Sequence, residues 1–214
     1  MTTQPPLLDF HAPEVEDADA AALEPEATHE SQRFAGLDLS ALDLTDSGFL
    51  ECELDGLTLT ETQLRGSRVI ESLITASFAP ILLGSRTTWR DVRIDRPRWG
   101  SAELYDAELT ALHIVGGKID YLNLRDSRLT NVLIEGCTIG ELDLRRTRLR
   151  RVALRDCTVG SMELDRASAK DVDIRSSQFT VVNGLDGLRG VTIDDGQLSL
   201  FAPLLAQHLG IVVE

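Results

Sequence analysis

The chain has 214 residues, of which 43% are hydrophobic and only 5% are aromatic, and its formal net charge at pH 7 is −14. This length and composition suffice for a single domain with a thin continuous core. The chain has no stretch of 18 apolar residues and no basic segment followed by an apolar one near its start. We therefore expect neither a membrane-spanning helix nor a signal peptide, and a cytoplasmic location.

Residues 1–33 differ in composition from the rest of the chain. They contain eight acidic residues, one basic residue and four prolines, and their apolar residues follow no period. Segments of this kind bury too little apolar surface to fold on their own. The sequence therefore predicts an acidic, disordered N-terminal arm.

From Phe34 to Phe179 apolar residues recur every five positions, and a second apolar or small residue stands two positions before each of them. On a helix these positions would scatter around the whole cylinder, and in a straight strand the step of three would turn side chains outward. The chain must turn a corner every five residues, which predicts an all-β solenoid over residues 34–182. The central residues of the unbroken part are Leu104, Leu109, Ile114, Ile119, Leu124, Leu129, Ile134, Ile139, Leu144, Leu149, Leu154, Val159 and Leu164.

A second period, of ten residues, sets the number of faces. The residue two before the centre alternates between large and small in the later repeats, and every second corner carries Gly or Asp, as a turn with φ > 0 favours. The number of faces must then be even, and four faces need twenty residues per coil. The corner residues are Asp46, Gly56, Gly66, Asp106, Gly116, Asp126, Gly136 and Asp156.

The three cysteines, Cys52, Cys137 and Cys157, all occupy the small inward position. With twenty residues per coil, Cys137 and Cys157 stack directly on each other. Parallel Cβ directions and a cytoplasmic setting disfavour a disulfide there. We predict free thiols that fill the core as small hydrophobic side chains.

The repeat is interrupted between Ile74 and Trp89, where Ala79 and Gly84 would be the central residues. The gap is still three fives, so we favour a degenerate coil over a bulged loop for residues 75–88. Five arginines then surround Trp89 and Trp99, which superficially resembles a nucleic-acid surface. Both tryptophans occupy central positions and should point inward, so we expect no direct nucleic-acid binding by them.

Residues 183–214 predict a loop followed by a helix that Asp194 or Asp195 caps and that Pro203 kinks or restarts. The helix is apolar on nearly all sides and therefore needs partners on nearly all sides. One side can close the open end of the solenoid, and a second copy in a C2 homodimer most simply covers the other. The stripe proposed for these cap and dimer contacts is Leu198, Phe201, Leu205 and Leu209, and a second stripe is Leu200, Leu204 and Ile211.

No pattern in the sequence indicates chemistry. None of the four histidines has metal-ligand spacing to a cysteine or to another histidine. The glycines of residues 184–190 are spaced by three, unlike those of a phosphate-binding loop. We therefore predict no catalytic residue, no metal, no cofactor and no enzymatic activity.

The segments 102–106 (AELYD), 122–126 (LNLRD) and 142–146 (LDLRR) resemble the A(D/N)LXX motif of the pentapeptide-repeat family. That resemblance implies a right-handed quadrilateral β-helix. The C-terminal helix is similar to the capping and dimerisation helix of the gyrase-protecting MfpA and Qnr proteins. Those relatives are thought to imitate duplex DNA and so to bind DNA gyrase.

The charge distribution decides where such mimicry could occur. Residues 34–80 carry a net charge of −6, whereas residues 81–170 carry +3, so the whole rod is not an acidic mimic of DNA. We predict a protein-interaction module of unassigned target, with a DNA-mimicking regulator of DNA gyrase as the alternative. The candidate acidic contact residues are Asp38, Asp43, Glu53, Glu61 and Glu71.

Overall fold

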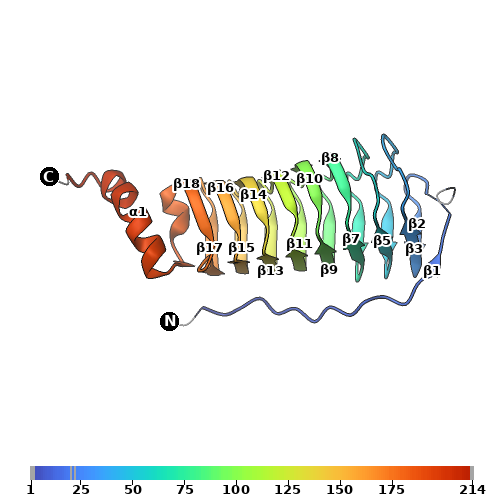
Figure 1. Ribbon diagram of the computed structural model, residues 1–214, viewed down its shortest axis with the longest axis horizontal. Coiled ribbons are helices and arrows are strands. Elements are labelled where there is room, and N and C mark those ends of the chain that lie inside the picture. The colour runs from blue at the N-terminus through green and yellow to red at the C-terminus, as the bar shows by residue number, and fades with distance from the viewer. Residues whose placement is uncertain (1–2, 20, 22, 213–214) are drawn as a thin grey trace.

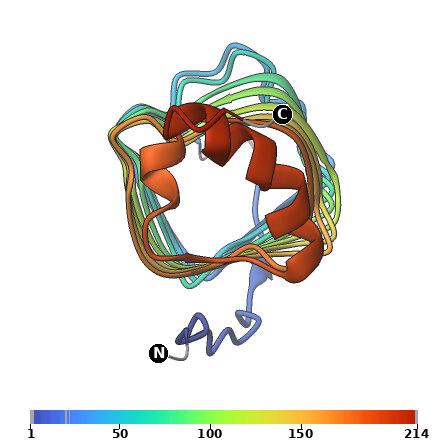
Figure 2. The same ribbon diagram turned by 90° about the vertical axis from the view of Figure 1, so that its left-hand side faces the viewer.

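The computed structural model describes residues 3–19, 21 and 23–212. It is a parallel β-solenoid of about nine turns that ends in one helix, α1 (Asp195–His208) (Figure 1). Seen along its axis, the coil is four-sided, and the chain advances toward the C-terminus as a right-handed turn (Figure 2). The predicted right-handed quadrilateral β-helix with a C-terminal helix is confirmed.

Two parallel sheets carry the coils, and in each sheet a strand pairs with strands from the coils before and after it. The larger sheet comprises β1 (Glu16–Asp17), β2 (Thr28–Glu30), β3 (Gln32–Ala35), β4 (Gly48–Leu50), β5 (Glu53–Asp55), β6 (Arg68–Ile70), β7 (Leu73–Thr75), β9 (Thr88–Asp95), β11 (Glu108–Val115), β13 (Arg128–Glu135), β15 (Arg148–Arg155), β17 (Ser168–Asp173) and β19 (Val191–Thr192). The smaller sheet comprises β8 (Phe78–Leu83), β10 (Arg98–Glu103), β12 (Lys118–Asn123), β14 (Thr138–Asp143), β16 (Thr158–Glu163) and β18 (Gln178–Asn183).

The register between coils is twenty residues, as predicted. Leu109 pairs with Leu129, and Ile119 pairs with Ile139. Identical positions therefore stack, and the central side chains form one continuous buried core. We number the four faces in chain order by their central residues: Leu109, Leu129 and Leu149 on the first face, Ile114, Ile134 and Leu154 on the second, Ile119, Ile139 and Val159 on the third, and Leu124, Leu144 and Leu164 on the fourth.

The predicted corners are also confirmed. All eight Gly and Asp corner residues have φ between 51° and 73°. Other corners adopt the same left-handed conformation without glycine, for example at Glu51, Asn131 and Arg151. The stacked backbone hydrogen bonds between coils hold these residues in a conformation that is disfavoured for L-residues.

The corner between the third and fourth faces differs along the rod. In the first two coils it is a left-handed turn, with Ala41 at φ 59° and Glu61 at φ 57°. From β8 onward each strand of the smaller sheet runs straight through this corner. The early coils therefore project further than the later ones, as the upper edge of Figure 2 shows.

The interrupted repeat is a coil and not a loop. Phe78 of β8 pairs with Arg98, and Ala79 is completely buried. Trp89 and Trp99 lie in the core, as predicted, and their indole N–H groups donate to the hydroxyls of Thr87 and Ser77 at 2.8 and 3.1 Å. Because both rings are enclosed, they are not available for stacking on bases.

The first coil begins before the predicted boundary at Phe34. Strand β2 pairs with β4, and His29 lies in the core, stacked on Phe49 with the ring centroids 5.2 Å apart. The predicted disordered arm over residues 1–33 is thus divided in the structure. Its last part belongs to the first coil, and residues 3–19 extend along the outside of the rod (Figure 1).

Helix α1 closes the C-terminal end of the solenoid. Asp194 is its N-cap, and Gln197 completes a capping box, with the Gln197 N–H 2.8 Å from the Asp194 carboxylate. The Gln197 amide donates to the carbonyls of Ile174 and Ser177 at 2.6 and 2.7 Å, and so satisfies two backbone acceptors at the end of the stack. The helix continues through Pro203 as one element, so the predicted restart there is absent.

Candidate functional site

The five candidate acidic residues do not share one surface. Asp38, Asp43 and Glu61 are exposed on the third and fourth faces of the first two coils. Glu53 lies on the second face, where Arg33 Nε is 3.2 Å from its carboxylate. Glu71 lies at the corner between the first and second faces, 3.6 Å from Arg90.

Two of the three acids on the third and fourth faces accept hydrogen bonds that favour their charged form. Asp38 accepts hydrogen bonds from the Ser40 hydroxyl and N–H, and these bonds lower the pKa of the Asp38 carboxyl. Asp43 accepts from Thr45 in the same way, which lowers the pKa of the Asp43 carboxyl. Together with Glu61 they form what we call the acidic end of the rod.

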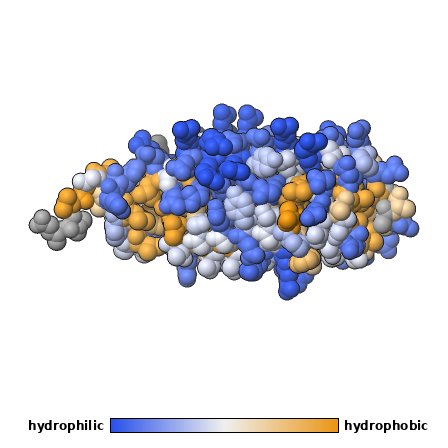
Figure 3. Space-filling view, turned by 90° about the horizontal axis from the view of Figure 1, so that it is seen from above, coloured by the Kyte–Doolittle hydropathy of each residue, from blue (hydrophilic) through white to orange (hydrophobic). Residues whose placement is uncertain are grey.

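The fourth face of the later coils pairs its charges internally. Asp143 is fully enclosed, and the guanidinium of Arg145 lies 2.5 Å from its carboxylate. Burial raises the pKa of Asp143, but the hydrogen bonds from Arg145 outweigh this effect and lower it. Arg146 pairs with Asp126 at 2.6 Å. Figure 3, which views this side of the rod, shows a hydrophilic surface along its middle.

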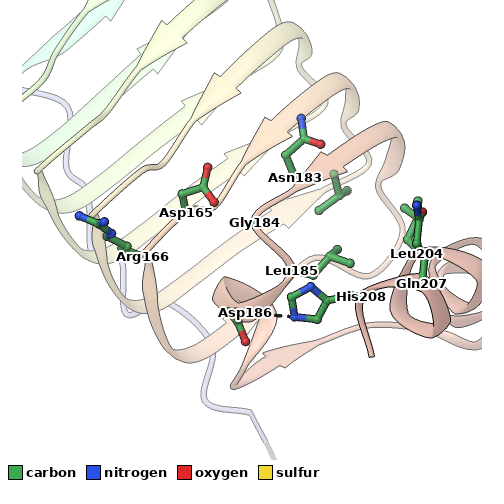
Figure 4. Close-up of a pocket in the computed structure, with 10 residues that line it drawn as sticks. Asp165, Arg166, Asn183, Gly184, Leu185, Asp186, Leu204, Gln207 and His208 are labelled. Carbon is green, nitrogen blue, oxygen red and sulfur yellow. Dashed lines mark ion pairs between the residues drawn. The ribbon is translucent and has the colours of Figure 1, made fainter. Parts of the chain in front are cut away.

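A cleft of about 540 Å³ lies between the last coil and α1. It is bordered by η2 (Leu185–Leu188), where Asp186 lies 3.6 Å from His208 Nε2, as Figure 4 shows. Leu204 and Gln207 of α1 form the opposite wall (Figure 4). Within the described residues no three His, Cys, Asp or Glu side chains could hold a metal ion, here or elsewhere.

Helix α1 divides the predicted apolar residues between two sides. Phe201 is buried against Phe179, with ring centroids 6.4 Å apart, and Leu205 also packs on the core. Leu198 and Leu209 face outward and are 50% and 70% exposed. The second predicted stripe is exposed as well, since Leu200 is 51% and Leu204 is 38% exposed. The cap side is thus Phe201 and Leu205. The exposed apolar residues lie on its two flanks, Leu198 and Leu209 on one flank, and Leu200 and Leu204, which also borders the cleft, on the other. Together with Ile211, which follows the helix, they form what we call the outer face of α1.

Sequence reasoning missed an apolar and basic groove on the third face. The exposed side chain of Phe78 and the adjacent Pro80 line a groove of about 730 Å³ together with Arg98 and Lys118. The available signal was the failed repeat itself, because Phe78 is a large apolar residue in an outward position. Such residues on a regular solenoid indicate a surface that is covered by something else.

The cysteines behave as predicted. All three are buried and free, and Cys137 and Cys157 belong to neighbouring coils. The adjacent Cys157 thiol and burial both raise the pKa of the Cys137 thiol. These groups therefore contribute packing and no accessible nucleophile.

No helix in the described part of the chain is long and apolar enough to cross a membrane.

No family model and no curated protein matches the sequence. The fold is similar to the crystal structure of HetL, a pentapeptide repeat protein involved in heterocyst differentiation regulation in the cyanobacterium Nostoc, with 13% identity, a TM-score of 0.33, and coverage of 80% of this chain and 91% of HetL. It is also similar to trypsin-treated QnrB1, a plasmid-mediated fluoroquinolone resistance protein, with 17% identity, a TM-score of 0.32, and coverage of 92% and 96%.

The sequence and the geometry agree on the type of repeat. The period of five residues, the register of twenty and the four-sided section all follow from one repeated unit. This combination supports the resemblance to the pentapeptide-repeat family that the sequence suggested. The chain is a right-handed quadrilateral β-helix built from pentapeptide repeats.

Proposed function

We propose that this chain is a non-enzymatic protein-interaction module whose first contact is homodimerisation through the outer face of α1. The observation that supports this most strongly is the exposure of five large apolar residues, of which Leu198, Leu200 and Leu204 belong to the helix and Leu209 and Ile211 follow it. Hydrophobic side chains gather at the C-terminal end of the rod in Figure 3. Large exposed apolar residues that gather at one end of a molecule favour an interaction site there.

A second copy fits this face better than a charged partner. Within the described part of α1 the only ionisable groups are Asp195 and His208, one at each end of the helix. Two copies related by a two-fold axis would therefore bring leucines together without opposing like charges. The solenoid faces of both copies would stay free for a further protein partner.

The test is the mass of the protein in solution. We expect the unmodified chain to be a dimer at micromolar concentration by light scattering, and the Leu200→Glu, Leu204→Glu double variant to be a monomer with an unchanged melting temperature. Ile81→Glu is the control, because Ile81 is an exposed apolar residue on the solenoid, and it should leave the dimer intact. An unmodified protein that is monomeric at this concentration contradicts the proposal.

A DNA-mimicking regulator of DNA gyrase is the second candidate. The observation that favours it is the acidic end of the rod, where Asp38, Asp43 and Glu61 are exposed and carry no ion pair within the described residues. QnrB1, whose fold is similar, is described as a fluoroquinolone resistance protein. Complementary charge of this kind mainly accelerates association and weakens with salt.

Supercoiling by purified gyrase, with and without a quinolone, tests this candidate. We expect the native chain to alter supercoiling, and the Asp43→Lys, Glu61→Lys double variant to lose the effect. Glu141→Lys is the matched control, since Glu141 occupies the position of Glu61 four coils later, outside the acidic end. If the native chain does not alter supercoiling at tens of micromolar, the gyrase proposal is wrong.

A further inference from the structure

The second face carries outward side chains that are nevertheless buried. Leu133 stands between the inward residues Val132 and Ile134, and Ala153 stacks on it from the next coil. Leu133 is only 7% exposed and Ala153 only 2%. An outward side chain of a solenoid is buried only where long neighbouring side chains, such as the arginines around Asp143, or another segment cover it.

The covering segment is the N-terminal arm. Residues 3–19 run the length of the rod in the direction opposite to coil stacking, beneath the second face (Figures 1 and 2). The Gln4 N–H lies 3.3 Å from Asp171 Oδ1, and the Leu7 N–H lies 3.3 Å from Asn131 Oδ1. At the other end β1 pairs with β3 in parallel.

The arm presents apolar side chains to the rod and acids to solvent. Its half-buried residues between these two anchors are mostly apolar, whereas Asp9, Glu14 and Glu16 are exposed. Alternation of this kind is typical of an extended segment with one covered face. The half-buried apolar residues are Pro6, Leu8, Phe10, Pro13 and Val15.

Backbone hydrogen bonds attach the arm to the solenoid near its two ends but not between them. From Leu8 to Val15 no hydrogen bond joins it to the solenoid within the described residues. Beneath it, the polar side chains of the second face bond to one another instead. His113 Nε2 lies 3.1 Å from Glu135, and His113 Nδ1 lies 3.2 Å from Arg93. The middle of the arm therefore depends on apolar contact alone, which another chain of the same pattern can supply.

We propose that the second face is a docking groove for an extended peptide with alternating apolar and acidic side chains, and that residues 3–19 occupy it in cis until such a peptide from a partner displaces them. Because residues 3–19 occupy the groove in the structure, we infer that a partner peptide has a similar pattern of side chains. Apolar side chains would cover Leu133 and Ala153, and acids would remain outward. The tether gives the arm a high effective concentration, so a partner must bind more tightly or arrive when the arm is released.

The experiment measures binding of a fluorescein-labelled synthetic peptide of residues 3–19 to the full chain by anisotropy. The unmodified chain should bind it weakly. The Leu8→Asp, Phe10→Asp double variant, which detaches its own arm, should bind it at least tenfold more tightly. Leu7→Asp is the matched control, because Leu7 is 65% exposed, and it should keep the weak binding of the unmodified chain.

Two further measurements keep the test specific. A peptide with Asp in place of Leu8 and Phe10 should not bind any of the chains, and Leu133→Asp introduced into the detached-arm variant should abolish binding of the natural peptide. Melting temperatures show that each variant is folded. Equal peptide affinities for the unmodified and detached-arm chains, or no binding to the detached-arm chain, overturn the proposal. A monomeric protein in the light-scattering test leaves it intact, because the second face and α1 are separate surfaces.

Discussion

The first coils and the later coils are built from the same repeat but do not have the same section. The early coils turn at four left-handed corners, including Ala41 and Glu61, whereas from β8 onward one of these corners is replaced by a continuous strand. The early lumen is wider and encloses an apolar cavity of about 30 Å³, although Phe34 and Phe49 are among its side chains. The conformation of one corner in each coil thus sets the width of the lumen, and the width of the lumen sets the size of the side chains that fill it.

The largest expected effect compares equivalent core positions in the two regions. Leu144→Asp places a charge in the narrow later lumen and should cost more than the ~2–5 kcal/mol of a Leu-to-Ala cavity, with loss of cooperative unfolding. Leu64 stands four coils earlier and borders the early cavity. Leu64→Asp should cost less, because the introduced carboxylate supplies the polar partners that a water molecule needs to enter this otherwise apolar space.

Urea denaturation of the two variants checks this prediction. A folded Leu144→Asp variant with an unchanged unfolding midpoint would refute the inward assignment. A Leu64→Asp variant that is equally or more destabilised would show that the early lumen is no more tolerant than the later one.

A smaller effect is expected at the charges of the fourth face. Arg145→Gln should destabilise the protein by about 1.5–3 kcal/mol, because it removes a charged hydrogen bond from the enclosed Asp143. At the equivalent early position, Arg65→Gln should be nearly neutral, since Gln63 stands where Asp143 stands. Equal losses in the two variants would contradict this account.

The same pair predicts a pH dependence. The folded-state pKa of Asp143 lies below its usual value, so the carboxylate stabilises the fold above its unfolded-state pKa, and this contribution is lost as the pH falls through the folded-state pKa. Removal of Arg145 reduces the shift. The free energy of unfolding should therefore fall less steeply with decreasing pH in Arg145→Gln than in the unmodified chain. Parallel curves for the two proteins would show that Asp143 does not contribute to the pH dependence.

The smallest expected effect is at the corner that distinguishes the two regions. Glu61→Gly should stabilise the protein by up to about 1 kcal/mol, because glycine adopts a positive φ without steric cost. At the same corner four coils later, Glu141 is not left-handed and belongs to β14, so Glu141→Gly should destabilise by about 0.5–1 kcal/mol. Thermal melts of the two variants should shift in opposite directions, and shifts of the same sign would contradict the difference in corner geometry.

The repeat made most of the fold predictable from sequence. A period of five fixes the register, the inward residues and the glycine and aspartate corners, because each coil rests only on its neighbours. The residues that decide the surfaces follow no period. Asp143 is enclosed because Arg145 and Arg125 close over it. Glu53 is paired by Arg33, which stands one coil before it but which composition assigned to the disordered arm. Glu71 is paired by Arg90, which is offset by one residue from the twenty-residue register.

The extended conformation of the arm could have been predicted from the spacing of its apolar residues. Leu8 and Phe10 flank Asp9, and Pro13 and Val15 flank Glu14, and this spacing indicates an extended segment with one covered face. Composition alone favoured disorder because it counted charges without their spacing. The sequence could also not state which side of the C-terminal helix caps the solenoid, since both stripes are leucine-rich, and the buried Gln197 decides it through two backbone carbonyls.

The contacts of Gln197 also bear on the length of the rod. A stack of parallel coils ends in a row of unpaired backbone groups that match the start of another stack, so such rods can grow end to end into open filaments. By occupying the carbonyls of Ile174 and Ser177 and covering Phe179, the helix takes part of the position that a further coil would need. We therefore expect helix α1 to prevent end-to-end association of rods at their C-terminal ends.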